Sequence, residues 1–154
     1  MPRFPLKVFW LILFVPVVIG TMLFAADTRT VTFYVQLICG SDSDKPLNPD
    51  WKPVGPKLNQ RLRAVFRWKH YWEVKRESVE LNQNHVARLH LTRERDVEVT
   101  SYAPPATRIR LYYNGQLTRC QHQPIGEHMC LLGGDAESGD SWFVTVRRDQ
   151  PVDP

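Results

Sequence analysis

TRIRLYYNGQLTRCQH, residues 107–122, is the stretch that decides the fold class of this chain. Two runs that are rich in β-branched and aromatic residues flank Asn114-Gly115, the strongest short signal for a two-residue hairpin turn. The turn sets the register of the hairpin, so that Cys120 lies opposite Ile109. Cys120 then belongs to the apolar face of the hairpin, which we predict to be its core face.

Short strands of the same kind fill most of the chain after residue 71. Their spacing and short turns are typical of an antiparallel meander that folds into a small sandwich or an open barrel. An early strand, residues 30–38, is apolar on both faces and is predicted to be buried. The predicted fold class is therefore mostly β. The other predicted strands cover residues 71–81, 85–91, 96–102, 107–113, 116–122, 128–132 and 141–148.

One short amphipathic helix is predicted near residues 56–67. Pro56 suits the first helical position, and Leu58 and Leu62 recur on one face of the helix. The Pro-rich segment before it, residues 40–56, is predicted to be a loop.

Residues 1–26 differ from the rest of the chain. Two basic residues precede an apolar run, residues 8–26, as in an export signal or a membrane anchor helix. We favour a cleaved signal peptide and keep a retained anchor as the alternative. Both put the following residues outside the cytoplasm, in the periplasm or secreted. These residues are then a single exported β-rich domain, residues 27–148, with a short tail at 149–154.

The exported domain carries little net charge. Without Arg3 and Lys7 the chain has 18 basic and 16 acidic residues, a net charge of +2. This balance, together with export, argues against a nucleic-acid partner. The sequence has no nucleophile elbow, zinc-protease motif or phosphate-binding loop. We therefore predict that the protein is not an enzyme and that it uses no cofactor unless one of the metal sites below is real.

CQHQPIGEHMC, residues 120–130, is nearly symmetrical. Its central PIG segment suits a three-residue hairpin loop, with proline at the first position and glycine at the third. Such a hairpin places Cys120 opposite Cys130 and His122 opposite His128. Because side chains two residues apart share a face of a strand, all four form a rectangle on one side.

Three interpretations of this rectangle stay open. We favour a disulfide between Cys120 and Cys130, because opposed strand positions have suitable Cα separations and an exported domain meets an oxidising compartment. The first alternative is a zinc or copper site made of all four residues. The second is a pair of reduced core thiols beside half-exposed histidines. Cys39 is predicted to be a buried thiol at the end of the first strand.

Two further groups of side chains are candidate sites. The glycine-rich segment GGDAESGD alternates acidic residues in a way that can hold calcium, although a solvated turn is the simpler interpretation. Its acidic residues are Asp135, Glu137 and Asp140. The outward face of the Asn-Gly hairpin is predicted to carry a partner-binding patch. This patch comprises Arg108, Arg110, Tyr112 and Arg119.

The predicted function is that of a small exported binding, adaptor or envelope-assembly module. Its partner is predicted to be a protein or a cell-envelope component, and the membrane is a partner only if the N-terminal helix is retained. One alternative is an extracytoplasmic enzyme or metal-binding protein that uses the cysteine–histidine rectangle. Another is a glycan-binding domain that stacks sugars on exposed aromatics among Trp68, Tyr71 and Trp72, although core packing is the favoured interpretation for at least one of the tryptophans.

Overall fold

The structure is a computed structural model that describes residues 30–103, 105–126, 129–137 and 139–153. Most of these residues form strands, which pair into two antiparallel sheets accompanied by one helix, α1. The prediction of a mostly β fold with an early helix is therefore confirmed. Every predicted strand has a counterpart whose ends agree within a few residues, apart from the extension of the last hairpin described below.

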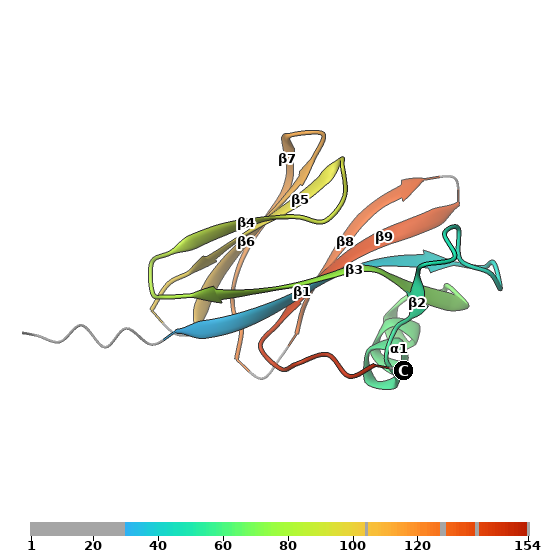
Figure 1. Ribbon diagram of the computed structural model, residues 1–154, viewed down its shortest axis with the longest axis horizontal. Coiled ribbons are helices and arrows are strands. Elements are labelled where there is room, and N and C mark those ends of the chain that lie inside the picture. Colours follow the sequence, from blue (N-terminus) through green and yellow to red (C-terminus); the bar gives the residue numbers. More distant parts are fainter. Residues whose placement is uncertain (1–29, 104, 127–128, 138, 154) are drawn as a thin grey trace, which may run out of the picture.

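A five-stranded sheet has the order β2-β3-β1-β9-β8 (Figure 1). Its central strand, β1, is buried along almost its whole length, as its continuous apolar run predicts. β1 therefore lies between β3 and β9, although β9 is close to the other end of the chain. The members of this sheet are β1 (Val31–Ser41), β2 (Lys52–Pro53), β3 (His70–Leu81), β8 (Cys130–Glu137) and β9 (Asp140–Arg147).

A four-stranded sheet follows the chain order β4-β5-β6-β7, which is a meander. Its strands are β4 (Val86–His90), β5 (Arg95–Ser101), β6 (Ala106–Tyr113) and β7 (Gln116–Pro124). The Asn-Gly turn between β6 and β7 forms as predicted, with φ of 48° at Asn114 and 78° at Gly115. Both values belong to the left-handed region that this two-residue turn requires.

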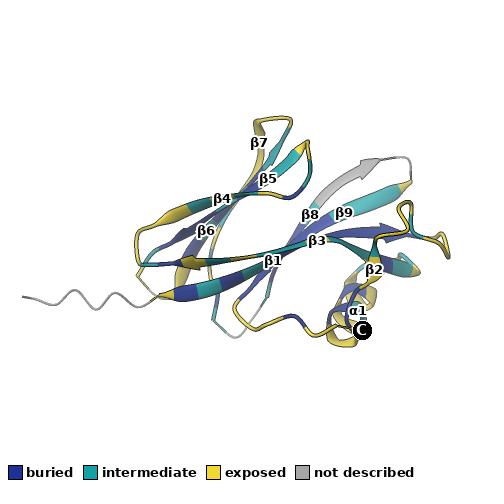
Figure 2. Cartoon of the chain, viewed as in Figure 1, coloured by how far each residue is buried: buried dark blue, intermediate teal, exposed yellow. Residues whose placement is uncertain are grey.

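The main core lies between the two sheets. Phe33, Val35 and Leu37 of β1 pack in one cluster with Val97 and Ile109 of the four-stranded sheet. Figure 2 shows this buried centre in dark blue, whereas β7 is largely exposed. Each of these side chains contributes about 1.5–3 kcal/mol by burial, so this cluster holds the two sheets together.

A second core lies on the opposite face of the five-stranded sheet, under α1 (Pro56–Val65). Leu58 and Leu62 of the helix are buried there with Phe143 of β9. The predicted start at Pro56 is confirmed, and the helix ends just before Phe66, whose extended backbone returns its ring to 4.5 Å from that of Phe143.

The C-terminal segment packs beside the start of this helix (Figure 1). Lys57 lies 3.8 Å from Asp149, and a Cβ added to Gly55 would clash with the carbonyl oxygen of Val152. The predicted tail therefore lies against the helix rather than away from the domain.

A β-bulge alters the predicted register of the Asn-Gly hairpin. Pairing follows the prediction next to the turn, but the register shifts between Leu111 and Tyr112, and Thr118 becomes the extra residue of β7. The prediction that Cys120 lies opposite Ile109 is wrong, because Cys120 lies opposite Arg110. One extra residue moves every later side chain of the strand to the other face, so Cys120 is exposed and does not belong to the core.

The predicted hairpin over residues 120–130 is also wrong. β7 pairs with β6 and β8 pairs with β9, so Cys120 and Cys130 belong to different sheets. The connection between the two sheets carries Ile125, whose side chain is 1% exposed in the main core. A hairpin would leave this side chain at an exposed tip, and its burial favours the crossing.

The glycine-rich segment near the end of the chain is mostly strand rather than an open loop. β8 and β9 stay paired as far as Glu137 and Asp140. The predicted signal or anchor helix, residues 8–26, lies outside the described residues. Among the residues that the structure describes, no helix is both long and apolar enough to cross a membrane.

Candidate functional site

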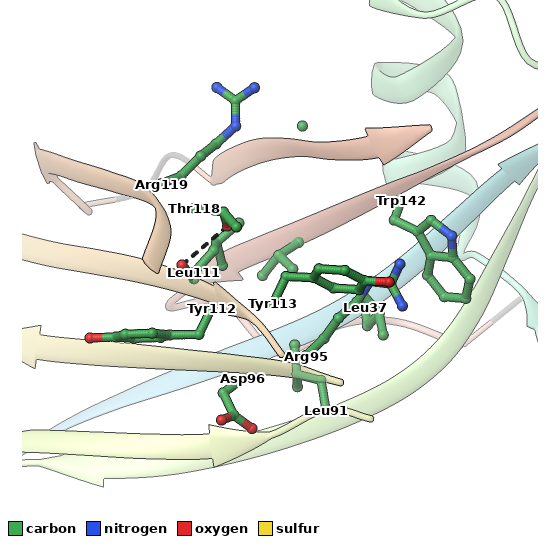
Figure 3. A pocket seen from close by; sticks show the side chains of 12 residues that line it. Leu37, Leu91, Arg95, Asp96, Leu111, Tyr112, Tyr113, Thr118, Arg119 and Trp142 are labelled. Carbon is green, nitrogen blue, oxygen red and sulfur yellow. Dashed lines mark hydrogen bonds between the residues drawn. The ribbon is translucent and has the colours of Figure 1, made fainter. Parts of the chain in front are cut away.

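A pocket of about 480 Å³ opens between the two sheets and is lined by residues of both (Figure 3). Its walls come from both sheets and from the β4–β5 turn. The apolar part of the lining consists of Leu37, Leu91, Leu111, Trp142 and Val144. Since most of these side chains also belong to the main core, the pocket is a continuation of that core to the surface.

The guanidinium of Arg95 is held between two aromatic rings in the wall of the pocket. Its Cζ atom lies 4.3 Å from the ring centre of Trp142 and 5.0 Å from that of Tyr113 (Figure 3). Only 11% of the Arg95 side chain is exposed, and Nη1 lies 3.7 Å from a carboxylate oxygen of Glu94. Trp142 is supported in turn by an edge-to-face contact with Trp51, with ring centres 5.7 Å apart. Such stacking fixes the position of the charge.

The β-bulge in β7 supplies the rim of the pocket. Thr118 donates a hydrogen bond to the carbonyl oxygen of Leu111 at 3.2 Å, and Arg119 lies opposite Leu111. The shift places Arg119 on the face of the sheet that lines the pocket, rather than on the outer face with Arg110 as predicted. A bulge can re-aim a side chain in this way beside a binding site.

The rest of the predicted patch does lie on the outer face of the four-stranded sheet. Arg110 donates a hydrogen bond to Glu98 at 3.0 Å, and the Tyr112 hydroxyl lies 3.4 Å from the other oxygen of that carboxylate. Arg108 is 3.4 Å from the hydroxyl of Thr100. Each of these three patch residues therefore has a polar partner within the sheet itself, while the buried Nε atoms of Arg108 and Arg110 have none in the described part of the chain.

The cysteines and histidines of the symmetrical segment do not form the predicted rectangle. Cys120 is exposed next to Arg110, whose guanidinium pKa is raised first by its hydrogen bond with the Cys120 side chain. Cys130 is buried opposite Val146, and all three cysteines are free thiols. His122 lies opposite Arg108 on the outer face, and His128 lies outside the described residues.

Burial sets the protonation of the two inner thiols. Desolvation raises the pKa of Cys39 to about 12 and that of Cys130 to about 11. The prediction of a buried Cys39 in the first strand is confirmed. Within the described ranges, no three His, Cys, Asp or Glu side chains are grouped to hold a metal ion.

The predicted calcium residues are only partly placed. Asp140 is the first residue of β9 and is half-buried. The side chains of Asp135 and Glu137 lie outside the described part, so the calcium site stays a prediction.

The aromatic residues considered for sugar stacking have mainly structural positions. Tyr71 is buried beside Phe143, and Trp68 packs against the same helix-side cluster. Trp72 is half-buried, and its ring stacks on that of His70 at 5.9 Å. The expectation that at least one of these tryptophans packs on the core is therefore confirmed, by Trp68.

Sequence reasoning missed the residues that line the pocket. In the sequence Arg95 closes the charged run TRER, residues 92–95, and Trp142 falls in an ordinary strand pattern, so neither carries a local signal of a site. Arg95 and Trp142 come into contact only because β1 pairs with β9, which brings Trp142 opposite Cys39.

Comparison of the chain with known protein families, curated proteins and solved structures found no match.

Proposed function

We propose that this protein is a binding module that takes the apolar part of a ligand into the pocket between its two sheets. The observation that carries the proposal is a cavity of about 480 Å³ with a buried apolar floor and one fixed guanidinium in its wall. Small-molecule sites are commonly about 300–1,000 Å³, mostly apolar, with a few fixed polar groups. The pocket agrees in its volume and its fixed polar group, and the buried part of its lining, Leu37, Leu111 and Val144, is apolar.

The proposal keeps the expectation that the domain works outside the cytoplasm. The basic and apolar N-terminal segment of the sequence supports export. The ligand would then be a component of the cell envelope or of the surrounding medium. The predicted adaptor role is compatible with this, because the pocket does not include the outer-face arginines Arg108 and Arg110.

A neutral apolar fluorophore, N-phenyl-1-naphthylamine, tests the proposal. It should bind the purified protein with an increase in fluorescence. Leu111 is in the pocket wall, and Leu111→Trp should fill the cavity and reduce binding at least about tenfold, since each 1.4 kcal/mol of lost burial is a factor of ten. Leu117→Trp is the matched control, because Leu117 is 53% exposed and outside the pocket lining.

A measurement of stability distinguishes a variant that loses binding because its pocket is filled from one that loses binding because it does not fold. Thermal unfolding of both variants shows whether they are folded. Thr118→Trp provides a second block, because Thr118 is an exposed rim residue whose replacement disturbs no core packing. Equal fluorophore binding by the native protein and by folded Leu111→Trp and Thr118→Trp proteins would refute the proposed site.

A further inference from the structure

We propose that the ligand of this pocket is a single-chain amphiphile with an acidic head group. Its chain lies between the sheets and its head group lies beside Arg95 and Arg119. This inference rests on the proposed function and adds the chemistry of the ligand.

The cavity has the size of an acyl chain. A water molecule occupies about 30 Å³ in the liquid, and a methylene group is of similar size, so about 480 Å³ holds at most about 16 such groups. A hydrocarbon chain has no polar groups to satisfy inside the cleft. A peptide strand would bring backbone N–H and C=O groups, which are costly to bury without partners against walls formed by Leu37, Leu111 and Val144.

The charges at the pocket favour an anion. Two arginines line it, Arg95 and Arg119, and the acidic residue of its described lining is Asp96. The Asp96 carboxylate is directed to the outer face, where it accepts a hydrogen bond from Arg88 at 2.8 Å and contacts His90 at 2.6 Å. Figure 3 shows it pointing away from the guanidinium of Arg95. Among the described lining residues, Arg95 and Arg119 are therefore the charged groups on the pocket side of the sheets.

Arg95 contributes a fixed charge at the apolar wall. The rings of Tyr113 and Trp142 hold its guanidinium, and its low exposure places it in a medium of lower effective dielectric than water. Glu94 offsets part of this charge from 3.7 Å, but its side chain is 47% exposed and screened by solvent.

Arg119 contributes a charge at the rim that is available to a ligand. Its side chain is exposed, and no ion pair or hydrogen bond joins it to another side chain in the described part of the protein. It stands on the strand that borders the opening, above the apolar lining (Figure 3). A guanidinium offers a planar set of donors that matches a carboxylate or a phosphate.

Displacement of the neutral fluorophore by four matched surfactants, each below its micelle concentration, tests this inference. The probes are dodecanoate, dodecyl phosphate, dodecanol and dodecylammonium, which share one chain and differ in the head. We expect both acids to bind about tenfold more tightly than dodecanol, and dodecylammonium to bind most weakly. The preference for acids should shrink as salt is added, since the head group is partly exposed.

A matched pair of variants tests whether Arg119 causes the preference for acidic over neutral amphiphiles. Arg119→Gln should lose most of the tenfold preference for dodecanoate and keep the affinity for dodecanol. Arg61→Gln should behave as the native protein, because Arg61 is exposed on α1, on the opposite face of the five-stranded sheet. Tighter binding of dodecanoate than of dodecyl phosphate would identify a fatty-acid type of ligand, and the reverse a single-chain (lyso) phospholipid type. Either result supports an acidic amphiphile.

Two outcomes would overturn the inference and leave the proposed function standing. One is equal affinity for dodecanol and dodecanoate. The other is an unchanged acid preference in Arg119→Gln together with Arg95→Gln, if both variants remain folded. Failure of all four probes and of the fluorophore to bind would instead refute the proposed function.

Discussion

Replacement of Ile125 by alanine tests the crossing of the chain between the two sheets. The Ile125 side chain is 1% exposed and belongs to the main core. Truncation of a buried isoleucine to alanine costs about 2–5 kcal/mol, because transfer free energy is lost and a cavity remains. We expect about 3 kcal/mol here, which corresponds to a fall in melting temperature of about 6–12 °C for a domain of this size.

Urea unfolding followed by tryptophan fluorescence measures the change in the free energy of unfolding. Leu117→Ala is the control, because Leu117 is 53% exposed on β7 and its truncation should cost less than about 0.5 kcal/mol. If Ile125→Ala also costs less than about 0.5 kcal/mol, Ile125 is at an exposed hairpin tip. The crossing between β7 and β8 would then be wrong, and the pairing of residues 120–130 that the sequence predicts would return.

Gly40→Ala should lower the free energy of unfolding by about 1–3 kcal/mol in the same assay, because the added Cβ would lie 2.6 Å from Cδ1 of Trp68; an unchanged midpoint would contradict this close packing. Alkylation of the folded protein near pH 8 should modify Cys120 alone, since Cys39 and Cys130 are buried and protonated. Peptide mass spectrometry identifies the modified thiol, and protection of Cys120 with release by a reductant would instead reveal a disulfide. The pKa values of Cys39 and Cys130 are higher in the folded protein than in the unfolded chain, where a cysteine thiol has its ordinary pKa of 9.0. The free energy of unfolding should therefore also fall as the pH rises above 9.0, because the unfolded chain then loses these protons more readily.

The sequence predicted the local elements well because their signals are local. Alternation and β-branched residues mark the strands, Pro56 marks the start of α1, and Asn114-Gly115 requires a turn with positive φ. Each of these features depends on residues only a few positions apart. The continuous apolar run of β1 also predicted its burial on both faces.

The same local patterns gave no reliable guide to strand partners. The PIG segment suits a hairpin loop. However, burial of the Ile125 side chain in the core stabilises the fold more than an exposed position at a turn would, and this burial accompanies the crossing of the chain from β7 to β8 in the other sheet. A local rule cannot weigh a turn preference against contacts with residues that are distant in the chain.

The candidate site depends on three features that only the tertiary structure decided. Pairing of β1 with β9 brings Trp142 into the same wall as Leu37, and the stacking of Arg95 on Trp142 follows from the way the two sheets face each other. The bulge at Thr118 then turns Arg119 to the pocket side. In a strand with a period of two residues, one inserted residue reverses the face of all those that follow. Sequence alternation alone therefore determined where the strands are, whereas packing between the sheets determined which side chains meet.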